Sequence, residues 1–223
     1  SVVDTTTPTR FHPLAASGAA RLADENWSGA FDLARQGHAV GRMTLAHDGR
    51  TGSGGLDIDA PSIAFTQAGL QPDDLSPLVA DFIQSPVEGA VGFEGRIDWL
   101  KDAEGTSSGR LTIPGLDFTS PAGPVKGLHG VIELTSLVPL VTAPNQQLTV
   151  ARLESVAPIT DIALTFGLDK SAFLVDGGEL NIAGGVVRVE PFTVPLDLAQ
   201  GFSGVALIAC GFYMLQPNQA AAI

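Results

Sequence analysis

The sequence of 223 residues contains few charged side chains, and very few of them are basic. Charged residues make up 16% of the chain, well below the roughly 25% of an average soluble domain. There are 24 acidic and 12 basic residues, which leave a net charge of −12. This balance argues against nucleic acid as a partner, because binding a duplex requires a basic surface that neutralises its phosphates.

Cysteine and the residue patterns of common catalytic and metal sites are also scarce. The one cysteine, Cys210, cannot form a disulfide within the chain. None of His12, His38, His47 and His129 stands at a metal-ligand spacing from another histidine, cysteine or carboxylate. There is no Gly-x-Ser-x-Gly nucleophile motif, Walker-type phosphate loop or complete dinucleotide-binding pattern. We therefore expect no enzymatic activity, no metal site and no cofactor.

The chain has no segment with the pattern of a transmembrane helix or a signal peptide. Its first residues, SVVDTTTPTRF, lack the basic and apolar regions of a signal peptide. Residues 202–215, FSGVALIACGFYML, are nearly all apolar but fall short of the roughly 20 residues that span a bilayer. We expect them to form a buried terminal strand, or an element whose partner lies outside the chain. We expect one domain over residues 1–223, excerpted from a larger protein and divisible into sub-units 26–127 and 128–205.

An alternation of apolar and polar residues with period 2 runs through most of the sequence, as is typical of strands with one buried face. In residues 91–99 the apolar side chains alternate with Glu94, Arg96 and Asp98, and residues 162–168 alternate in the same way. Turn signals such as HDGRTG, DAEGTSSG and VDGGE separate these runs. The pattern predicts an all-β, mainly antiparallel fold.

Residues 71–83, QPDDLSPLVADFI, are the best candidate for helix. Pro72, Asp73 and Asp74 suit the first turn of a helix. Pro77 should divide the segment into two short turns, because proline disrupts a helix interior. The sequence therefore predicts one or two short helices beside the strands.

Two stretches of the chain resemble each other. Residues 41–58, GRMTLAHDGRTGSGGLDI, are echoed by residues 95–113, GRIDWLKDAEGTSSGRLTI, with a period close to 54 residues. Each copy has a Gly-Arg pair, alternating apolar residues, a turn rich in Gly and Ser, and a second alternating run. This echo predicts a repeated hairpin-like unit that stacks onto its neighbour.

Strands that are apolar on one face must cover that face with a second sheet, with their own curvature, or with something apolar from outside. Aromatic residues make up only 6% of the chain, whereas Val, Ile, Leu and Ala abound. Such a smooth aliphatic surface suits acyl chains better than sugars. We therefore expect an elongated, curved and twisted sheet whose apolar face forms a groove for the acyl chains of a lipid.

Residues 128–198 contain the most distinctive motifs. These are SLVPLVTAPNQQLTV, then DIALTF, then LNIAGGVV from Leu180, and EPF from Glu190. With them this region resembles the C-terminal region of the YdbH-type proteins of the bacterial AsmA-like group, sometimes catalogued under a "dicarboxylate transport" domain name. The resemblance covers roughly a third of the chain.

The resemblance implies a large periplasmic protein of the cell envelope, anchored in the inner membrane by an N-terminal helix. Its stacked β units would carry phospholipids toward the outer membrane, with a small outer-membrane lipoprotein as partner. The motif residues would be structural, with Gly184 and Gly185 in a tight turn. The chain departs from the family in having no anchor helix and no match beyond Phe202. The expected groove-lining residues are Ile162, Leu164, Phe166, Leu168, Leu180, Ile182, Val187 and Val189.

Residues 134–150, LTSLVPLVTAPNQQLTV, carry no charge and contain two prolines. Pro139 and Pro144 cannot donate hydrogen bonds to a sheet, which argues against a central strand. We expect the segment to leave the sheet, cover part of the apolar face and return as the strand QQLTV. An ordinary core loop is the alternative. The candidate lid residues are Leu137, Val138, Leu140 and Val141.

Two other functions remain open at this point. One is a structural or assembly module, whose apolar face is covered internally and whose exposed strand edge recruits a partner by β-strand augmentation. The other is a binding site for small dicarboxylates, which would require converging Arg or Lys side chains. Arg42 and Arg96 are the only repeated basic positions, and we expect both on strand surfaces.

Overall fold

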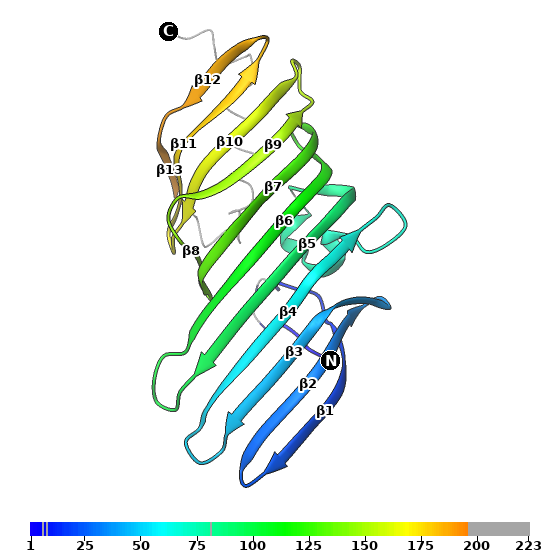
Figure 1. Ribbon diagram of the computed structural model, residues 1–223, viewed down its shortest axis with the longest axis vertical. Coiled ribbons are helices and arrows are strands. Elements are labelled where there is room, and N and C mark those ends of the chain that lie inside the picture. The colour runs from blue at the N-terminus through cyan, green and yellow to red at the C-terminus, as the bar shows by residue number, and fades with distance from the viewer. Residues whose placement is uncertain (6, 8, 81, 196–223) are drawn as a thin grey trace.

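The chain forms one antiparallel sheet of 13 strands that twists and curls along its length (Figure 1). This computed structural model describes residues 1–195 except 6, 8 and 81. The strands lie in the order β1-β2-β3-β4-β5-β6-β7-β9-β10-β11-β12, with β8 beside β7 and β13 beside β11. The strands are β1 (Ala15–Ala23), β2 (Asn26–Arg35), β3 (His38–Asp48), β4 (Ser53–Phe65), β5 (Gln84–Trp99), β6 (Thr106–Ser120), β7 (Gly123–Leu137), β8 (Leu140–Thr142), β9 (Gln146–Leu153), β10 (Ile159–Leu168), β11 (Ala172–Ile182), β12 (Gly185–Val189) and β13 (Phe192–Pro195).

The predicted all-β, elongated and curved architecture is confirmed. Most neighbouring strands are consecutive in the chain and are joined by short turns, except that residues 66–83 connect β4 to β5. The expected terminal element at residues 202–215 and Cys210 lie outside the described residues. The division into sub-units 26–127 and 128–205 stays a prediction. Its boundary falls inside β7, which pairs with both β6 and β9.

Two-residue turns with left-handed backbone conformations connect several hairpins. Asp24 and Glu25 have φ of 50° and 66°, and Ala183 and Gly184 have φ of 49° and 80°. Positive φ at both central residues matches the twist of the flanking strands, as in type I′ turns. The turn between β11 and β12 is therefore Ala183–Gly184, and the expected Gly184–Gly185 turn is wrong by one residue. Gly185 already pairs with Ile182.

The two copies of the sequence echo fold as equivalent adjacent hairpins. The first copy spans β3 and β4, the second spans β5 and β6, and β4 pairs directly with β5. Each hairpin-like unit therefore extends the sheet by pairing with the edge of its neighbour, which is the repeated arrangement that the echo predicts.

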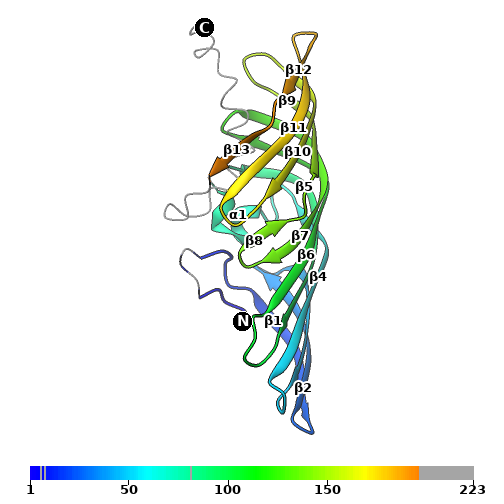
Figure 2. The ribbon, with the colours of Figure 1, turned by 90° about the vertical axis from the view of Figure 1, so that its left-hand side faces the viewer.

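The segment between β4 and β5 forms the two short helices that the sequence predicts, α1 (Pro72–Leu75) and η1 (Pro77–Val79). Gln71 and Asp74 form a capping box at the start of α1, and Ser76 accepts a hydrogen bond from the backbone N–H of Leu78 at the start of η1. Pro77 separates the two turns. Seen edge-on, this segment and the chain before β1 lie on the same side of the sheet (Figure 2).

Apolar side chains gather on one face of the sheet and polar side chains on the other. The buried core runs from Ala60 and Ile63 on β4 through β5, β6, β7, β9 and β10 to Leu180 on β11. Val87 and Leu153 are its least exposed large side chains, at 0% and 1%. The core face is the one crossed by α1 and η1. Leu75 of α1 and the flanking residues Leu70 and Ile83 pack into the same cluster.

Candidate functional site

The eight predicted groove-lining residues lie in one apolar cluster. Ile162, Phe166, Leu168 and Leu180 are buried, whereas Leu164, Ile182, Val187 and Val189 are partly buried and pack against them. Leu164 and Phe166 face β9 at Leu148 and Gln146, in an unbroken register that keeps the alternate side chains of β10 on one face. The Phe166 and Phe173 rings stack with their centroids 5.3 Å apart, a contact between β10 and β11 that the alternation pattern does not indicate. The structure brings these residues together as a layer, and lipid contact by them stays a prediction.

The same face is less covered in the first half of the sheet. Phe31, Met43 and Ile58 lie directly opposite one another across β2, β3 and β4. Leu45, Leu56 and Ile97 form the next row, across β3, β4 and β5. All six side chains are half-buried. Because Ile97 stands four positions from Phe93, which packs against the core, with no register shift between them, these rows continue the core face.

These two rows, which we call the open rows, are not among the residues that the sequence predicts for the site. Their alternation is visible in residues 41–58 and 91–99, but period 2 shows only that residues share a face. How much of each side chain remains uncovered depends on what packs against it from distant parts of the chain. The open rows are therefore a candidate surface that sequence reasoning missed.

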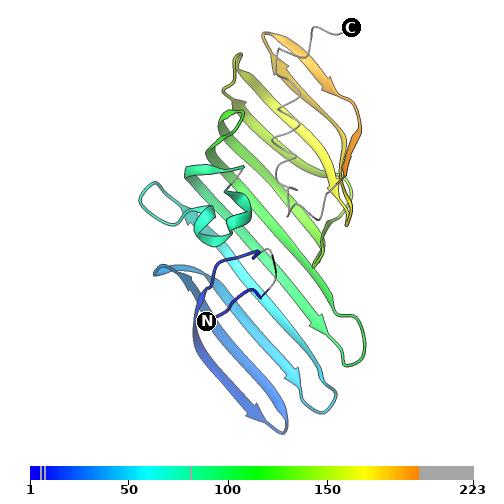
Figure 3. The same ribbon diagram turned by 180° about the vertical axis from the view of Figure 1, so that it is seen from behind.

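Two segments cross the apolar face beside the open rows and bind each other (Figure 3). One is the N-terminal segment, the chain before β1, and the other connects β4 to β5. The backbone N–H of His12 donates to the Leu75 carbonyl over 2.8 Å, and the Ser76 hydroxyl donates to the Arg10 carbonyl. Arg35, the last residue of β2, donates to the carbonyls of Asp74 and Pro13 over 2.8 and 3.1 Å. We call residues 66–83 the strap, since its underside buries Leu70, which is 2% exposed, against the core.

The candidate lid residues border the face in a way that differs in part from expectation. Residues 134–137 complete β7, and Leu140–Thr142 pair back onto it as β8, so the segment stays in the sheet. Pro139 and Pro144 occupy the connections on either side of β8, where no ladder donor is needed. Leu137 covers glycines of the apolar face, because a Cβ at Gly109 would lie 3.1 Å from its Cδ2. Leu140 packs against the core, Val141 is half-buried, and Val138 is 63% exposed.

Comparison with protein families supports the resemblance noted in the sequence. A family model described as YdbH-like, intermembrane phospholipid transport protein YdbH, matches residues 3–203. The chain belongs to the YdbH-like family. No curated protein and no solved structure matches it. Transport between two membranes places the family in the cell envelope.

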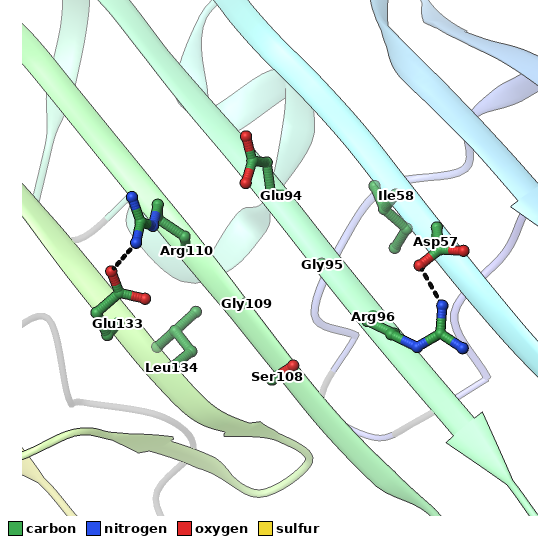
Figure 4. Close-up of a pocket in the computed structure, with 10 residues that line it drawn as sticks. All are labelled: Asp57, Ile58, Glu94, Gly95, Arg96, Ser108, Gly109, Arg110, Glu133 and Leu134. Atoms are coloured by element: carbon green, nitrogen blue, oxygen red, sulfur yellow. Dashed lines mark hydrogen bonds and ion pairs between the residues drawn. The ribbon is translucent and has the colours of Figure 1, made fainter.

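The face of this YdbH-like chain opposite the core carries charged side chains in cross-strand pairs (Figure 4). Arg96 donates to Asp57 over 2.8 Å and to Asp98 over 2.6 and 2.8 Å, and Arg110 lies 2.7 Å from Glu133. The hydrogen bonds to Asp98 and then to Asp57 raise the pKa of Arg96 above its usual value. These groups border an open depression of about 390 Å³. Its basic side chains are already matched by carboxylates.

The two repeated arginines do not converge on a common site. Arg96 is held by carboxylates, and Arg42 lies directly opposite Asp32 and Asp59 on the neighbouring strands. A dicarboxylate would have to displace or approach these acidic groups, so the arrangement argues against that function. Among the described residues there is also no group of three or more His, Cys, Asp or Glu placed to hold a metal ion. No helix in the described part of the chain is long and apolar enough to cross a membrane.

Proposed function

We propose that this domain is a periplasmic module of an intermembrane phospholipid transport protein and that its apolar face binds acyl chains. The observation that carries the proposal is the pair of open rows, six half-buried aliphatic and aromatic side chains that continue directly into the buried core. An apolar sheet face that is left partly uncovered is costly in water, and a ligand with hydrocarbon tails removes that cost. Membership of the YdbH-like family supports a phospholipid as that ligand.

The free energy gained by moving an acyl chain from water onto an apolar surface is large. Each methylene group moved from water onto an apolar surface contributes about 0.8 kcal/mol. An acyl chain laid along the face therefore needs no specific polar partner to bind. Binding of this kind is insensitive to exact tail structure, which suits a surface that passes lipids along rather than one that selects a single ligand.

The strap, the segment before β1 and Leu137 limit how a lipid enters. The strap and the N-terminal segment cover the side of the face where β4 ends and β5 begins, and Leu137 covers glycines on β5 and β6. We propose that Leu137, Val138, Leu140 and Val141 act as a partial lid at this border. The eight residues Ile162, Leu164, Phe166, Leu168, Leu180, Ile182, Val187 and Val189 would line the continuation of the groove.

We infer the setting of the whole protein from the family resemblance. The full-length protein would be anchored in the inner membrane, would cross the periplasm and would work with a small outer-membrane lipoprotein. The domain itself would act without catalysis, since lipid transfer along an apolar surface makes and breaks no covalent bond.

A second candidate function, recruitment of a partner by β-strand augmentation, is favoured by the edge at β1. The outer side of β1 pairs with no described strand, and its sequence, AASGAARLA, contains no proline and only one charged residue. Natural sheets usually protect such an edge. A strand added to β1 would not require the open rows, so its binding should survive removal of lipid.

Native mass spectrometry of the purified chain mixed with phospholipid tests the main proposal. We expect bound phospholipid in the native chain and its loss in Leu45→Asp, because a carboxylate in the middle of the open rows cannot contact hydrocarbon without a desolvation cost. Thr44→Asp is the matched control, since Thr44 is exposed on the opposite face of the same strand. Equal lipid occupancy in both variants, with both folded by circular dichroism, would reject the groove.

A further inference from the structure

Both tryptophans of the chain lie in one row at the border of the apolar face. The row crosses five strands through directly opposed residues, Leu22, Trp27, His47, Gly54 and Trp99. On β3, β4 and β5 this row lies two positions from the open row of Leu45, Leu56 and Ile97, on the side of the turns. Trp99 ends β5 and Trp27 is the second residue of β2, so the row follows the turns at the lower left of Figure 1. We call it the aromatic rim.

The side chains of the aromatic rim are arranged as a polar–apolar boundary. The Trp99 ring lies over Gly54, where a Cβ would come within 2.3 Å of its Cζ2 atom. From there it reaches His47, with ring centroids 6.0 Å apart, and its Nε1–H donates to His47 Nδ1 over 3.2 Å. Since Nδ1 accepts this bond, the hydrogen of a neutral His47 is on Nε2, which is then a donor for an oxygen ligand.

The exposure of the rim fits contact with a lipid rather than with the core. Trp27 is 45% exposed and Leu22 is 54% exposed, although both are large and apolar. Indole rings favour the level in a bilayer where hydrocarbon meets the polar headgroups, because one ring offers both an apolar face and an N–H donor. The rim offers this chemistry at the border of the open rows.

The charges beyond the aromatic rim are mostly negative. The turns that follow it, residues 24–25, 48–52 and 100–105, hold more carboxylates than cations. An ammonium group is attracted to such a border and to the face of an exposed indole, whereas a headgroup with a net negative charge is repelled. The acidic residues are Asp24, Glu25, Asp48, Asp102 and Glu104, and the basic ones are Arg50 and Lys101.

We propose that the aromatic rim holds the glycerol–phosphate region of a zwitterionic, amine-bearing phospholipid. Its acyl chains lie on the open rows, His47 Nε2–H donates to a phosphate or ester oxygen, and the ammonium group projects over the acidic turns. The other border of the face is occupied by the strap and the N-terminal segment, which leaves the rim as the side where headgroups reach water. This inference rests on the proposed function and deepens it.

Two measurements on the 223-residue chain test the inference. Phospholipids with bromine near the carboxyl end of the acyl chains should quench tryptophan fluorescence more strongly than lipids with bromine near the methyl end. Trp27→Phe leaves Trp99 as the one fluorophore of this kind and separates the two contributions. In native mass spectrometry with an equimolar mixture of phosphatidylethanolamine and phosphatidylglycerol, the amine lipid should be favoured by about two- to fivefold.

Matched neutralisation decides whether the acidic turns cause that preference. Asp24→Asn, Glu25→Gln, Asp102→Asn and Glu104→Gln combined should bring the ratio close to one. The combined control Glu88→Gln, Asp176→Asn, Glu179→Gln and Glu190→Gln removes as many charges elsewhere and should leave the ratio unchanged. Lipid binding with no headgroup preference, or with stronger quenching by bromine at the methyl end, would overturn the rim while leaving the groove in place. Absence of any bound lipid would instead reject the proposed function.

Discussion

Arg35 and Asp74, 39 positions apart, are joined by a 2.8 Å hydrogen bond from the guanidinium Nε to the backbone carbonyl. A second bond from Arg35, to the Pro13 carbonyl, ties the N-terminal segment to the same side chain. One residue at the end of β2 therefore holds both segments that cross the apolar face. Polar contacts with Arg35 hold one edge of the strap, and apolar packing against the core holds its underside.

Replacing Arg35 with methionine should loosen the strap selectively. The substitution keeps an apolar stem and removes both hydrogen bonds, so we expect a loss of about 1 kcal/mol of local stability. Hydrogen exchange of the amides in residues 66–83 should accelerate, while amides in β9 and β10 should not change. Arg21→Met on exposed β1 is the control. Uniform acceleration over the whole chain would contradict the role of Arg35 as a local tie.

Val87 and Val156 are a matched pair for measuring how much the buried core contributes to the free energy of unfolding. Val87 is fully buried beneath the strap, and Val156 is 89% exposed. Val87→Ala should lower the free energy of unfolding by about 2 kcal/mol, through lost burial and the cavity left behind. Val156→Ala should change it by less than about 0.5 kcal/mol. Urea unfolding measures both, and similar losses in the two variants would show that the apolar face is not packed as described.

The Trp99 ring lies over Gly54 and leaves no room for a side chain at that position. A methyl group there would come within 2.3 Å of Trp99 and within 2.6 Å of the Ala46 carbonyl. Gly54→Ala should displace the indole from His47, shift its fluorescence emission and lower the melting temperature. Gly115→Ala, where nothing lies within 4 Å of the added methyl group, should do neither. An unchanged emission spectrum in Gly54→Ala would argue against the Trp99–His47 contact.

The turn between β10 and β11 should weaken in acid because of Asp169. Its carboxylate accepts hydrogen bonds from the backbone and side chain of Ser171 and from the backbone of Ala172, and these lower the pKa of Asp169. A lowered pKa in the folded state means that the stabilisation is present above the ordinary value, about 3.9, and is lost as the pH falls through the folded value. The Ser171 and Ala172 amide resonances should therefore titrate below that ordinary value. Titration at or above it would contradict the assignment, and Asp169→Asn should abolish it.

Local pattern is sufficient to predict the strands, the broken helix and the stacked hairpins. The alternation around Glu94, Arg96 and Asp98 and the position of Pro77 act within a few residues, where backbone sterics and side-chain direction decide the structure. The Ala183–Gly184 turn begins one residue before the predicted one, and the pattern misses it because alanine rarely adopts positive φ.

The site depends on contacts that no local pattern encodes. The pairing of β8 with β7 uses a free stretch of β7 beyond β9. The bonds from Arg35 to Asp74 and from His12 to Leu75 join distant segments. These contacts determine which part of the apolar face is covered, and hence why the open rows lie on β2 to β5 while the predicted lining residues of β10 and β11 are mostly buried.

Photo-crosslinking at two adjacent positions of β4 tests the central claim most directly. Leu56 belongs to the open rows, and Asp57 is exposed on the opposite face. A benzophenone amino acid at position 56 should form a covalent adduct with phospholipid from vesicles, and the same group at position 57 should not. Adducts of equal yield at both positions, or at position 57 alone, would contradict an acyl-chain groove on the apolar face.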